Sequence, residues 1–320
     1  MSAPPEPGPG GPPRLAVLHR FDPWRSPLCT CVPKLSLDPY TGCPGECAYC
    51  YAATYLWRYW GPERVRPKRD LLARLRRDLA KINAGADPDL AAWQGAWVTI
   101  SNSSDPYPTV PAADERALGL TRRALQLLVA GGMGVLLQTK SDRFTRDLDV
   151  LPPERTVLGV TVTTLDAALA ARLEPGMPPP AARLAAVAEA ARAGFATLVR
   201  VDPLVPGLND EATGVAELVA ASAAAGARQV VCSTVKLQPG SRQRLTERFP
   251  GLARSLAEDY TEAQGRGGYW QLPRRRREDL LRGLRAAVLA AGMAFSVCRE
   301  EGLGHLSTAA CDGRQWAGRG

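Results

Sequence analysis

The run TGCPGECAYCYA at residues 41–52 carries three cysteines, Cys43, Cys47 and Cys50, within eight residues. This C-x3-C-x2-C spacing offers three thiolates to an iron–sulfur cluster, which takes four ligands, so one iron stays open to another molecule. Structural zinc takes four protein ligands, and neither of the chain's two histidines lies near the triplet in the sequence. The triplet therefore predicts a four-iron cluster with one open iron. A zinc knuckle and a group of buried structural thiols are the alternatives.

The same segment resembles the radical S-adenosylmethionine (radical SAM) enzymes, in which an aromatic residue precedes the last cysteine, as Tyr49 does here. The resemblance extends to the subgroup that contains the spore photoproduct lyases and covers roughly residues 29–240. It implies a 4Fe–4S cluster whose open iron binds S-adenosylmethionine. It also implies reductive cleavage to a 5′-deoxyadenosyl radical that abstracts a hydrogen atom from a substrate. The segments that carry the resemblance are SLDPYTGC at 36–43, SNSSDPYP at 101–108, LTRRAL at 120–125, QTKSDRFTRDLDVL at 138–151, GVTVTTLD at 159–166, RLEPGMPPPAAR at 172–183 and VDPLVPGLND at 201–210.

Composition predicts one large α/β domain after a short leader. The chain has 320 residues, 45% of them hydrophobic, and single α/β barrels commonly reach this length. Residues 1–26 are predicted to be a disordered Pro/Gly-rich leader without the pattern of a signal peptide, and 27–320 to be the barrel with a short C-terminal extension. No apolar run is long enough to span a bilayer, so we expect a cytoplasmic protein without membrane contact. Eight cysteines in that reducing compartment favour metal binding over disulfides.

Short β-rich runs alternate with amphipathic stretches from residue 33 onward, which predicts six βα units around a parallel sheet. Gly131, Gly194 and Gly226 each end a helical pattern just before a strand, where a left-handed residue would terminate the helix. Six right-handed units give an open partial (β/α)6 TIM-like barrel, which is also the fold that the resemblance implies. The predicted strands are Lys34–Leu37, Ala96–Ser101, Gly134–Thr139, Val157–Thr163, Ala196–Val201 and Gln229–Val235.

Polar residues follow these strands at the carboxyl end of the barrel, where the loops of such barrels form the active site. The resemblance implies that Tyr49 places main chain near the adenine of S-adenosylmethionine. It also implies cofactor contacts from Ser104, Asp105, Lys140 and Thr161, with Arg183 and Arg200 as further candidates; Lys140 suits the carboxylate of the cofactor. Each residue also has an ordinary interpretation: a solvated lysine, a β-branched strand residue, or an Asp-Pro turn.

The substrate cannot be taken from the resemblance, because the lyases carry a hydrogen-donating cysteine where this chain has Asn102. Cys232 is the remaining candidate for such a donor, although the run QVVCSTV around it also suits a buried structural cysteine. No other catalytic residue is predicted. Photoproduct-lyase-type DNA repair is the alternative to an unknown radical reaction.

The charge of the chain keeps nucleic acid among its candidate partners. The formal net charge is +8, with a basic run at Arg274–Arg277 and further basic residues from Arg64 to Arg77. Such clusters contact phosphates in nucleic-acid-binding proteins, but arginines on amphipathic helices are more often only solvated. A non-catalytic, metal-stabilised nucleic-acid-binding protein is therefore the alternative from another class. The resemblance in turn implies a reducing partner such as a flavodoxin or a ferredoxin.

Four more cysteines, Cys29, Cys31, Cys298 and Cys311, lie near the two ends of the chain. A barrel can bring its ends together, and four thiolates would hold structural zinc or a second iron–sulfur cluster. His305 is a spare ligand. Unligated thiols or a disulfide are the alternatives, because C-x-C spacing is less diagnostic than C-x2-C.

Overall fold

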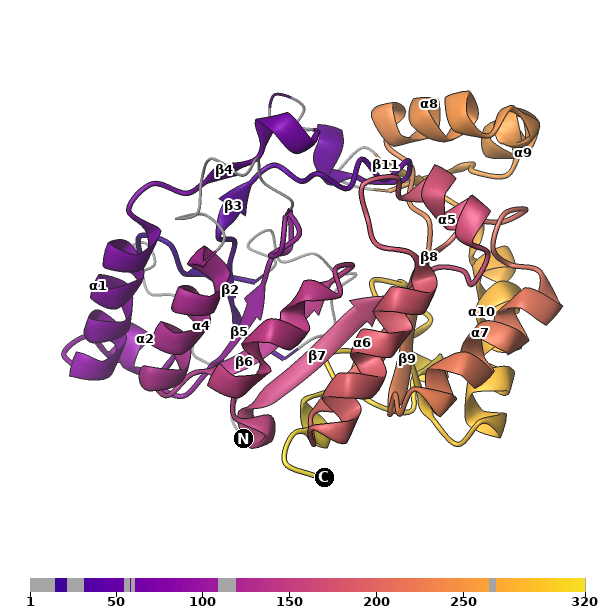
Figure 1. The fold of residues 1–320 in the computed structure, drawn as a ribbon. Coiled ribbons are helices and arrows are strands. Elements are labelled where there is room, and N and C mark those ends of the chain that lie inside the picture. Colours follow the sequence, from indigo (N-terminus) through magenta and orange to yellow (C-terminus); the bar gives the residue numbers. More distant parts are fainter. Residues whose placement is uncertain are drawn as a thin grey trace.

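The computed structural model describes residues 15–21, 32–54, 58, 61–108, 119–264 and 269–319. It is a mixed α/β structure around an eight-stranded sheet in the order β1-β2-β5-β6-β7-β8-β9-β12 (Figure 1). Only β1 pairs antiparallel in this sheet; the remaining pairs are parallel. The strands are β1 His19–Arg20, β2 Leu35–Leu37, β5 Trp97–Ile100, β6 Gly134–Thr139, β7 Thr156–Thr161, β8 Ala196–Leu204, β9 Gln229–Thr234 and β12 Ala294–Val297. The sheet is curved and does not close, so the predicted α/β partial barrel is confirmed.

The longer helices alternate with the strands and lie on the outer side of the curved sheet (Figure 1). They are α1 Leu71–Ala84, α4 Leu120–Ala130, α6 Pro180–Arg192, α7 Ala212–Ala224 and α10 Arg274–Ala290. The shorter elements are α2 Pro88–Ala91, α5 Ala167–Leu173, α8 Pro239–Arg248 and α9 Ala253–Glu258, with small two-stranded sheets formed by β3 Tyr40–Thr41 and β4 Arg66–Pro67 and by β10 Glu262–Gln264 and β11 Tyr269–Gln271. Helices α8 and α9 project above the carboxyl end of the sheet, beside α5 (Figure 1).

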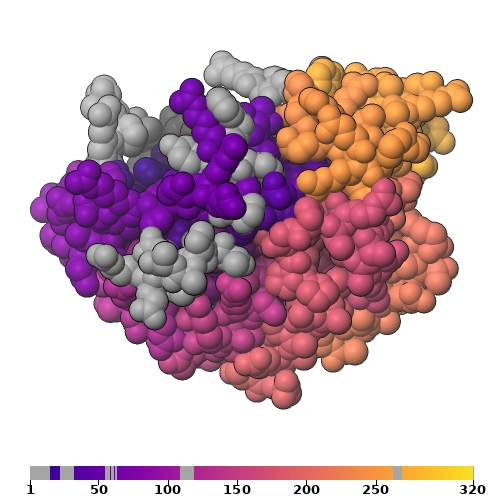
Figure 2. All heavy atoms as spheres, turned by 45° about the horizontal axis from the view of Figure 1, so that its top comes forward, coloured from indigo at the N-terminus to yellow at the C-terminus, as the bar shows by residue number. Residues whose placement is uncertain are grey.

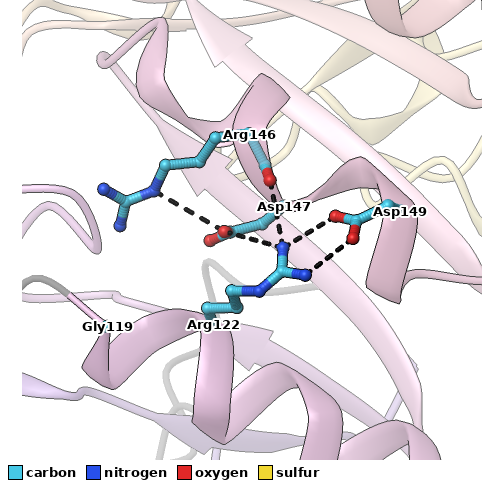
Figure 3. Close-up of a pocket in the computed structure, with 5 residues that line it drawn as sticks. All are labelled: Gly119, Arg122, Arg146, Asp147 and Asp149. Atoms are coloured by element: carbon cyan, nitrogen blue, oxygen red, sulfur yellow. Dashed lines mark hydrogen bonds and ion pairs between the residues drawn. The ribbon is translucent and has the colours of Figure 1, made fainter.

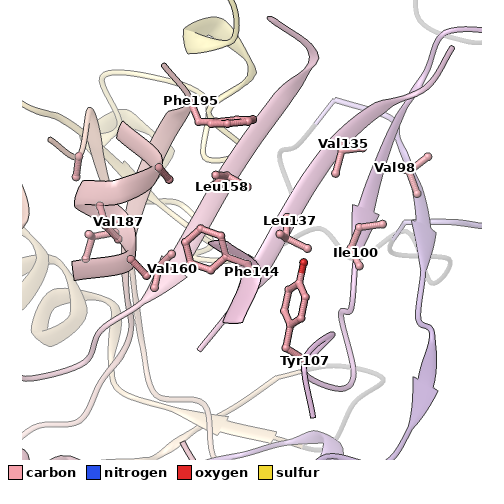
Figure 4. Packing of buried hydrophobic residues seen from close by; sticks show 14 of the residues in the cluster. Val98, Ile100, Tyr107, Val135, Leu137, Phe144, Leu158, Val160, Val187 and Phe195 are labelled. Carbon is pink, nitrogen blue, oxygen red and sulfur yellow. The ribbon is translucent and has the colours of Figure 1, made fainter. Parts of the chain in front are cut away.

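The main core lies between the sheet and the helices (Figure 4). Alternate residues of the central strands, such as Val135 and Leu137 of β6, point toward this side and are buried. Phe144 of the 3-10 helix Arg143–Val150 fills the space beneath them and is 0% exposed. Burying one such side chain contributes roughly 1.5–3 kcal/mol. The other face of the sheet is more polar: a Cβ on Gly159 would lie 3.5 Å from Cδ of Arg200 and 3.6 Å from Cγ of Gln138.

The C-terminal region completes the sixth βα unit and adds one strand. Helix α10 follows β9 as the helix of that unit, and β12 pairs parallel with β9. The sequence contains the signal for this strand, because an amphipathic run ends at Gly292, with φ +75°, just before the strand AFSV. The C-terminal extension therefore contributes a parallel strand, β12, that was not among the six predicted strands.

The segment after β12 covers the inner face of the sheet. Trp316 donates from Nε1 to Oε1 of Gln229 at 2.8 Å, and Gln229 donates from Nε2 to O of Ala310 at 2.9 Å. Gly313 packs so closely that a Cβ there would lie 2.6 Å from Cδ1 of Leu198. This segment, residues 309–319, shields the apolar residues at the base of the sheet interior.

Residues 15–21 were predicted to belong to the disordered leader, and this part of the prediction is wrong. His19 and Arg20 form β1 against β2. The cause is Asp78 of α1, whose buried carboxylate accepts the backbone N–H groups of residues 16–18 at 2.8–3.1 Å. Residues 1–14 of the leader lie outside the described residues.

Two of the three predicted helix-terminating glycines, Gly194 (φ +85°) and Gly226 (φ +82°), have left-handed conformations. At the third helix end Gly131 has φ −80° and the next residue, Gly132, has φ +77°.

Among the described residues, none of the helices has the length and apolarity needed to cross a bilayer.

Candidate active site

The cysteine loop, residues 42–51, lies between β3 and the 3-10 helix Ala52–Thr54, after the carboxyl end of β2. Two backbone contacts tie it to the end of α5 and the residues that follow: Ala48 N–H donates to O of Leu173 at 2.8 Å, and Gly176 N–H donates to O of Gly45 at 3.3 Å. Figure 2 turns this end of the molecule forward and shows the indigo and purple part of the chain beside the orange segment of α8 and α9. The loop thus occupies the rim at which active sites of such barrels form.

Backbone amides lie near two of the thiols of the loop. Those of Gly45 and Asp105 act to lower the pKa of Cys43, and those of Ala52 and Ala53 act to lower the pKa of Cys50. These amides favour a thiolate, but burial works against it. Burial raises the pKa of the Cys43 thiol to about 12, and the nearby Asp105 carboxylate adds to the increase.

Burial likewise raises the pKa values of Cys47 and Cys50. Without a cation, all three thiols would therefore stay protonated at neutral pH. A bound cation would reverse this, because metals bind the thiolate form.

Gly45 packs closely beside two of the thiols. A Cβ at this position would lie 3.4 Å from Sγ of Cys47, 3.5 Å from Sγ of Cys43 and only 2.3 Å from Cε of Met177. Glycine therefore lets the chain pass between Met177 and the thiols, and the three sulfur donors with their nearby amides fit an iron–sulfur cluster.

Over the described ranges, no three His, Cys, Asp or Glu side chains are arranged to hold one metal ion. Ligands of a single zinc ion must all lie about 2.3 Å from it. A cluster binds each thiolate at a different iron, so the triplet need not meet that tighter arrangement.

A buried carboxylate, Glu174, links the cysteine loop to the strands. It accepts hydrogen bonds from Oη of Tyr49, from Oγ1 of Thr163 at 3.3 Å and from Nη1 of Arg183. Arg183 also donates to the carbonyl oxygens of Thr161 at 3.1 Å and Pro178 at 2.7 Å. Arg183 is thus a structural partner of Glu174, and this pairing argues against Arg183 as a ligand of the cofactor. Sequence reasoning missed Glu174, because nothing in the run RLEPG distinguishes it from a solvated glutamate.

Lys140 lies beside the loop, with Nζ 5.6 Å from the ring centroid of Tyr49. Burial lowers the pKa of Lys140, but the nearby Cys47 and Glu174 side chains outweigh burial and raise it overall. The side chain is only half-buried, so a fixed positive charge faces the space beside the cysteine loop. Such a charge suits a carboxylate ligand.

The predicted pair Ser104 and Asp105 is already engaged within the protein. Asp105 accepts from Oγ1 of Thr139 at 2.8 Å and from the backbone amides of Lys140 at 2.8 Å and Tyr107 at 2.9 Å. Ser104 donates to O of Tyr40 at 3.4 Å. The Asp105 carboxylate therefore joins the ends of β5 and β6.

The inner face of the sheet carries a second polar group below the rim. Arg200 donates to Oδ2 of Asp202 at 2.6 Å, and Ser233 donates to Oδ1 of the same carboxylate at 2.5 Å. Burial alone would raise the pKa of Asp202, but Arg200 and Ser233 outweigh it and lower the pKa. Burial would lower the pKa of Arg200, but Asp202 and the nearby Cys298 and Cys311 outweigh it and raise the pKa.

Cys232 occupies a different place from these polar groups. It is 0% exposed and packs in the core between the sheet and the helices. Burial raises the pKa of its thiol well above the usual value. Its position argues against contact with a substrate inside the barrel.

A surface hollow beside α4 is lined by charged residues that pair with one another (Figure 3). Arg122 donates from Nη1 and Nη2 to Asp149 at 2.7 and 2.6 Å, and Asp147 lies 3.5 Å from both Arg122 and Arg146. None of the predicted site residues lines this hollow. Its charges compensate one another, so it is not a candidate active site.

The basic run at 274–277 is partly structural. Arg277 is buried and donates from Nη1 to Oε2 of Glu300 at 2.8 Å, and Arg274 donates to O of Gly302 at 3.1 Å. Only part of this run is left for contacts with a partner.

A sequence model of the radical SAM superfamily matches residues 37–219, more than half of the chain. The chain belongs to the radical SAM superfamily. This match begins at the last residue of β2 and spans the cysteine loop, Lys140 and β5 to β8, which contribute to the rim described above.

The chain is also similar to proteins whose descriptions give no activity. The proteins Mb2609c of Mycobacterium bovis and Rv2578c of Mycobacterium tuberculosis, both described as uncharacterized, are 27% identical over 246 residues, which covers 74% of this chain and 68% of theirs. ORF301 of Acidianus two-tailed virus is 34% identical over 116 residues. That match spans 36% of this chain and only 36% of the length of the viral protein.

Solved structures of spore photoproduct lyase share the fold. A mutant of that enzyme with bound AdoMet and dinucleoside spore photoproduct superposes with a TM-score of 0.66 and 18% identity, covering 88% of this chain and 78% of the lyase. A second mutant gives a TM-score of 0.65 at 18% identity, covering 89% and 79%. At this identity the likeness establishes the fold alone.

Proposed function

We propose that this chain is a radical SAM iron–sulfur enzyme that cleaves S-adenosylmethionine reductively and abstracts a hydrogen atom from a substrate. The observation that carries the proposal is the loop of Cys43, Cys47 and Cys50 at the rim of the barrel, where backbone amides lie near the sulfurs of Cys43 and Cys50 and favour their thiolates. A bound 4Fe–4S cluster would supply the electron that converts S-adenosylmethionine to methionine and a 5′-deoxyadenosyl radical.

The chain's own residues would bind and orient the cofactor. The three cysteines would hold the cluster. Lys140 would pair with the carboxylate of S-adenosylmethionine, since its charge faces the cysteine loop. Tyr49, fixed by Glu174, would present main chain to the adenine, and Thr161 would line the same rim. Ser104 and Asp105 would act by holding the rim in place, because their side chains are engaged within the protein.

Anaerobic reconstitution tests this function. The wild-type protein should be brown, show a 4Fe–4S signal and release 5′-deoxyadenosine from S-adenosylmethionine after reduction with dithionite. Alanine at Cys43, Cys47 or Cys50 should abolish that product, whereas Cys232→Ala should retain it because Cys232 lies in the helix-facing core. A colourless wild type, or full cleavage by a triplet variant, would refute the proposal. In the cell we propose a flavodoxin or ferredoxin as the reductant, in the reducing cytoplasm where free thiols persist.

Photoproduct repair is the second candidate, favoured by the shared fold. It is disfavoured at the position of the hydrogen donor, where Asn102 offers an amide that accepts from Oγ1 of Thr99 at 3.5 Å. An amide does not readily replace a thiol as hydrogen-atom donor. We therefore expect no useful turnover of dinucleoside spore photoproduct to two thymines. Efficient turnover would establish repair as the function.

A non-catalytic nucleic-acid-binding protein is the alternative from a different class. The net charge of +8 supports phosphate contacts, but Arg277 and Arg274 are engaged within the fold. Salt-dependent binding of DNA or RNA without any S-adenosylmethionine cleavage would favour this class.

We also propose a second metal site made of Cys29, Cys31, Cys298 and Cys311, holding zinc or another cluster. Cys29 and Cys31 lie outside the described residues, and no disulfide joins the described cysteines. The support is a contact between sequence neighbours of two of these cysteines: Nζ of Lys34, three residues after Cys31, lies 3.4 Å from Oδ2 of Asp312, the residue after Cys311. Metal analysis of a variant that lacks the catalytic triplet should find zinc or iron, which Cys298→Ser and Cys311→Ser should remove. Absence of metal from the triplet variant would dispose of the second site.

A further inference from the structure

Helix α8 brings two arginines to the cysteine loop from a region to which sequence analysis assigned no role. Nη2 of Arg244 donates to the carbonyl oxygen of Cys50 at 2.5 Å. One helical turn later, Nη1 of Arg248 donates to the carbonyl oxygen of Glu46 at 2.8 Å. These two carbonyls flank the Cys47–Cys50 half of the loop, so α8 holds that half at both ends.

The sequence of α8 places one face against the loop. Leu245, between the two arginines, is 0% exposed and belongs to the same buried cluster as Cys47 and Ala48. Gly240 leaves room for the arginine: a Cβ there would lie 3.3 Å from Nη1 of Arg244. Residues at this three- and four-residue spacing share one side of a helix.

The far end of α8 is fixed independently of the loop. Arg172 of α5 donates from Nη2 to the carbonyl oxygen of Arg248 at 2.5 Å. Its guanidinium also lies 4.3 Å from the ring centroid of Phe249, which is buried. The helix is therefore anchored on α5, and the cysteine loop is anchored on the helix.

Arg244 is half-buried, so its charge acts through a medium of lower effective dielectric constant than water. Arginine keeps its proton at any pH that the protein meets. Reduction adds negative charge to a cluster, and charges outside its immediate ligands tune the potential at which this happens.

We infer that Arg244 is a positioning residue that holds the Cys50 end of the loop and makes the cluster easier to reduce. The inference rests on the proposed function, because it requires a cluster on the triplet. It assigns a role in electron uptake to a helix that lies outside the residues matched by the superfamily.

The test compares three variants of the reconstituted full-length protein. R244Q removes the charge and keeps an N–H donor, while R244K keeps the charge and loses the planar fork. R242Q is the matched control, because Arg242 is on the same helix but its guanidinium lies over Trp270, 5.9 Å from the ring centroid. Iron content is measured first, and then the fraction of reduced cluster is followed by EPR in a redox titration without substrate.

At a fixed potential, R244Q should show a ratio of reduced to oxidised cluster about tenfold lower than wild type, which is a shift of about 59 mV for one electron. R244K and R242Q should stay close to wild type. A wild-type potential for R244Q, or an equal shift for R242Q, would overturn the inference. If R244Q retains no iron, R244K decides: it must hold the cluster at the wild-type potential, and failure to do so overturns the assignment. A wild-type protein without a 4Fe–4S signal would instead refute the proposed function.

Discussion

The strand–helix repeat from β2 to β9 and the region that follows it are held together in different ways. In the repeat, apolar residues recur at strand and helix spacing, and the predicted strands coincide with the observed ones to within three residues at each end. In the later region, single half-buried polar contacts join distant residues, such as Arg244 with Cys50 and Trp316 with Gln229. Periodic burial thus specifies the barrel, whereas isolated hydrogen bonds position the parts that cover the cysteine loop and the barrel interior.

The largest loss of stability is expected from substitution of Glu300, which joins β9 to the C-terminal region. Its carboxylate accepts from the backbone amide of Thr234 at 2.7 Å, from Lys236 at 2.9 Å and from Arg277 at 2.8 Å, and the side chain is fully buried. Glu300→Ala would leave the Arg277 charge buried without this partner. We expect a loss of about 3–5 kcal/mol in the free energy of unfolding, measured by urea denaturation.

The exposed neighbour Glu301 provides the control for this experiment. Glu301→Ala should change the free energy of unfolding by less than about 0.5 kcal/mol. Equal unfolding midpoints for the two variants would mean that Glu300 does not hold the C-terminal region in place.

The sequence predicts much of the rim, because a cysteine triplet and strand ends are local features. Lys140 was expected beside the cofactor and lies next to Tyr49. Glu174 was not expected, because its partner Tyr49 is 125 residues away and no spacing rule connects them. The orientation of Cys232 was also open, since a strand buried on both faces shows no alternation of polar and apolar residues. Partners that are distant in sequence therefore remain the unpredicted part of the site.

A smaller loss of stability is expected from substitution of Asp78, which holds the N-terminal segment 15–20 on α1. Asp78→Ala would remove the acceptor of three backbone N–H groups, and we expect a loss of about 2 kcal/mol. Hydrogen exchange should quicken in residues 16–20 and stay unchanged in β6 and β7. Arg77→Ala, an exposed neighbour on the same helix, should leave both regions unchanged. Uniform acceleration across the sheet would show that the N-terminal segment is an integral part of the barrel core.

The smallest expected changes in stability concern two glycines, one in a turn of the repeat and one in the helix that follows it. Gly132 and Gly283 both have open space where a Cβ would be added, so neither substitution to alanine creates a clash. They differ in backbone: Gly132 has φ +77° in the turn before β6, whereas Gly283 lies within helix α10. Alanine at Gly132 should cost about 1 kcal/mol, because a left-handed conformation disfavours a Cβ. Alanine at Gly283 should stabilise by about 0.8 kcal/mol through higher helix propensity. Thermal unfolding of both variants tests the opposite signs, and a shared sign would mean that local backbone preference does not set the stability at these two positions.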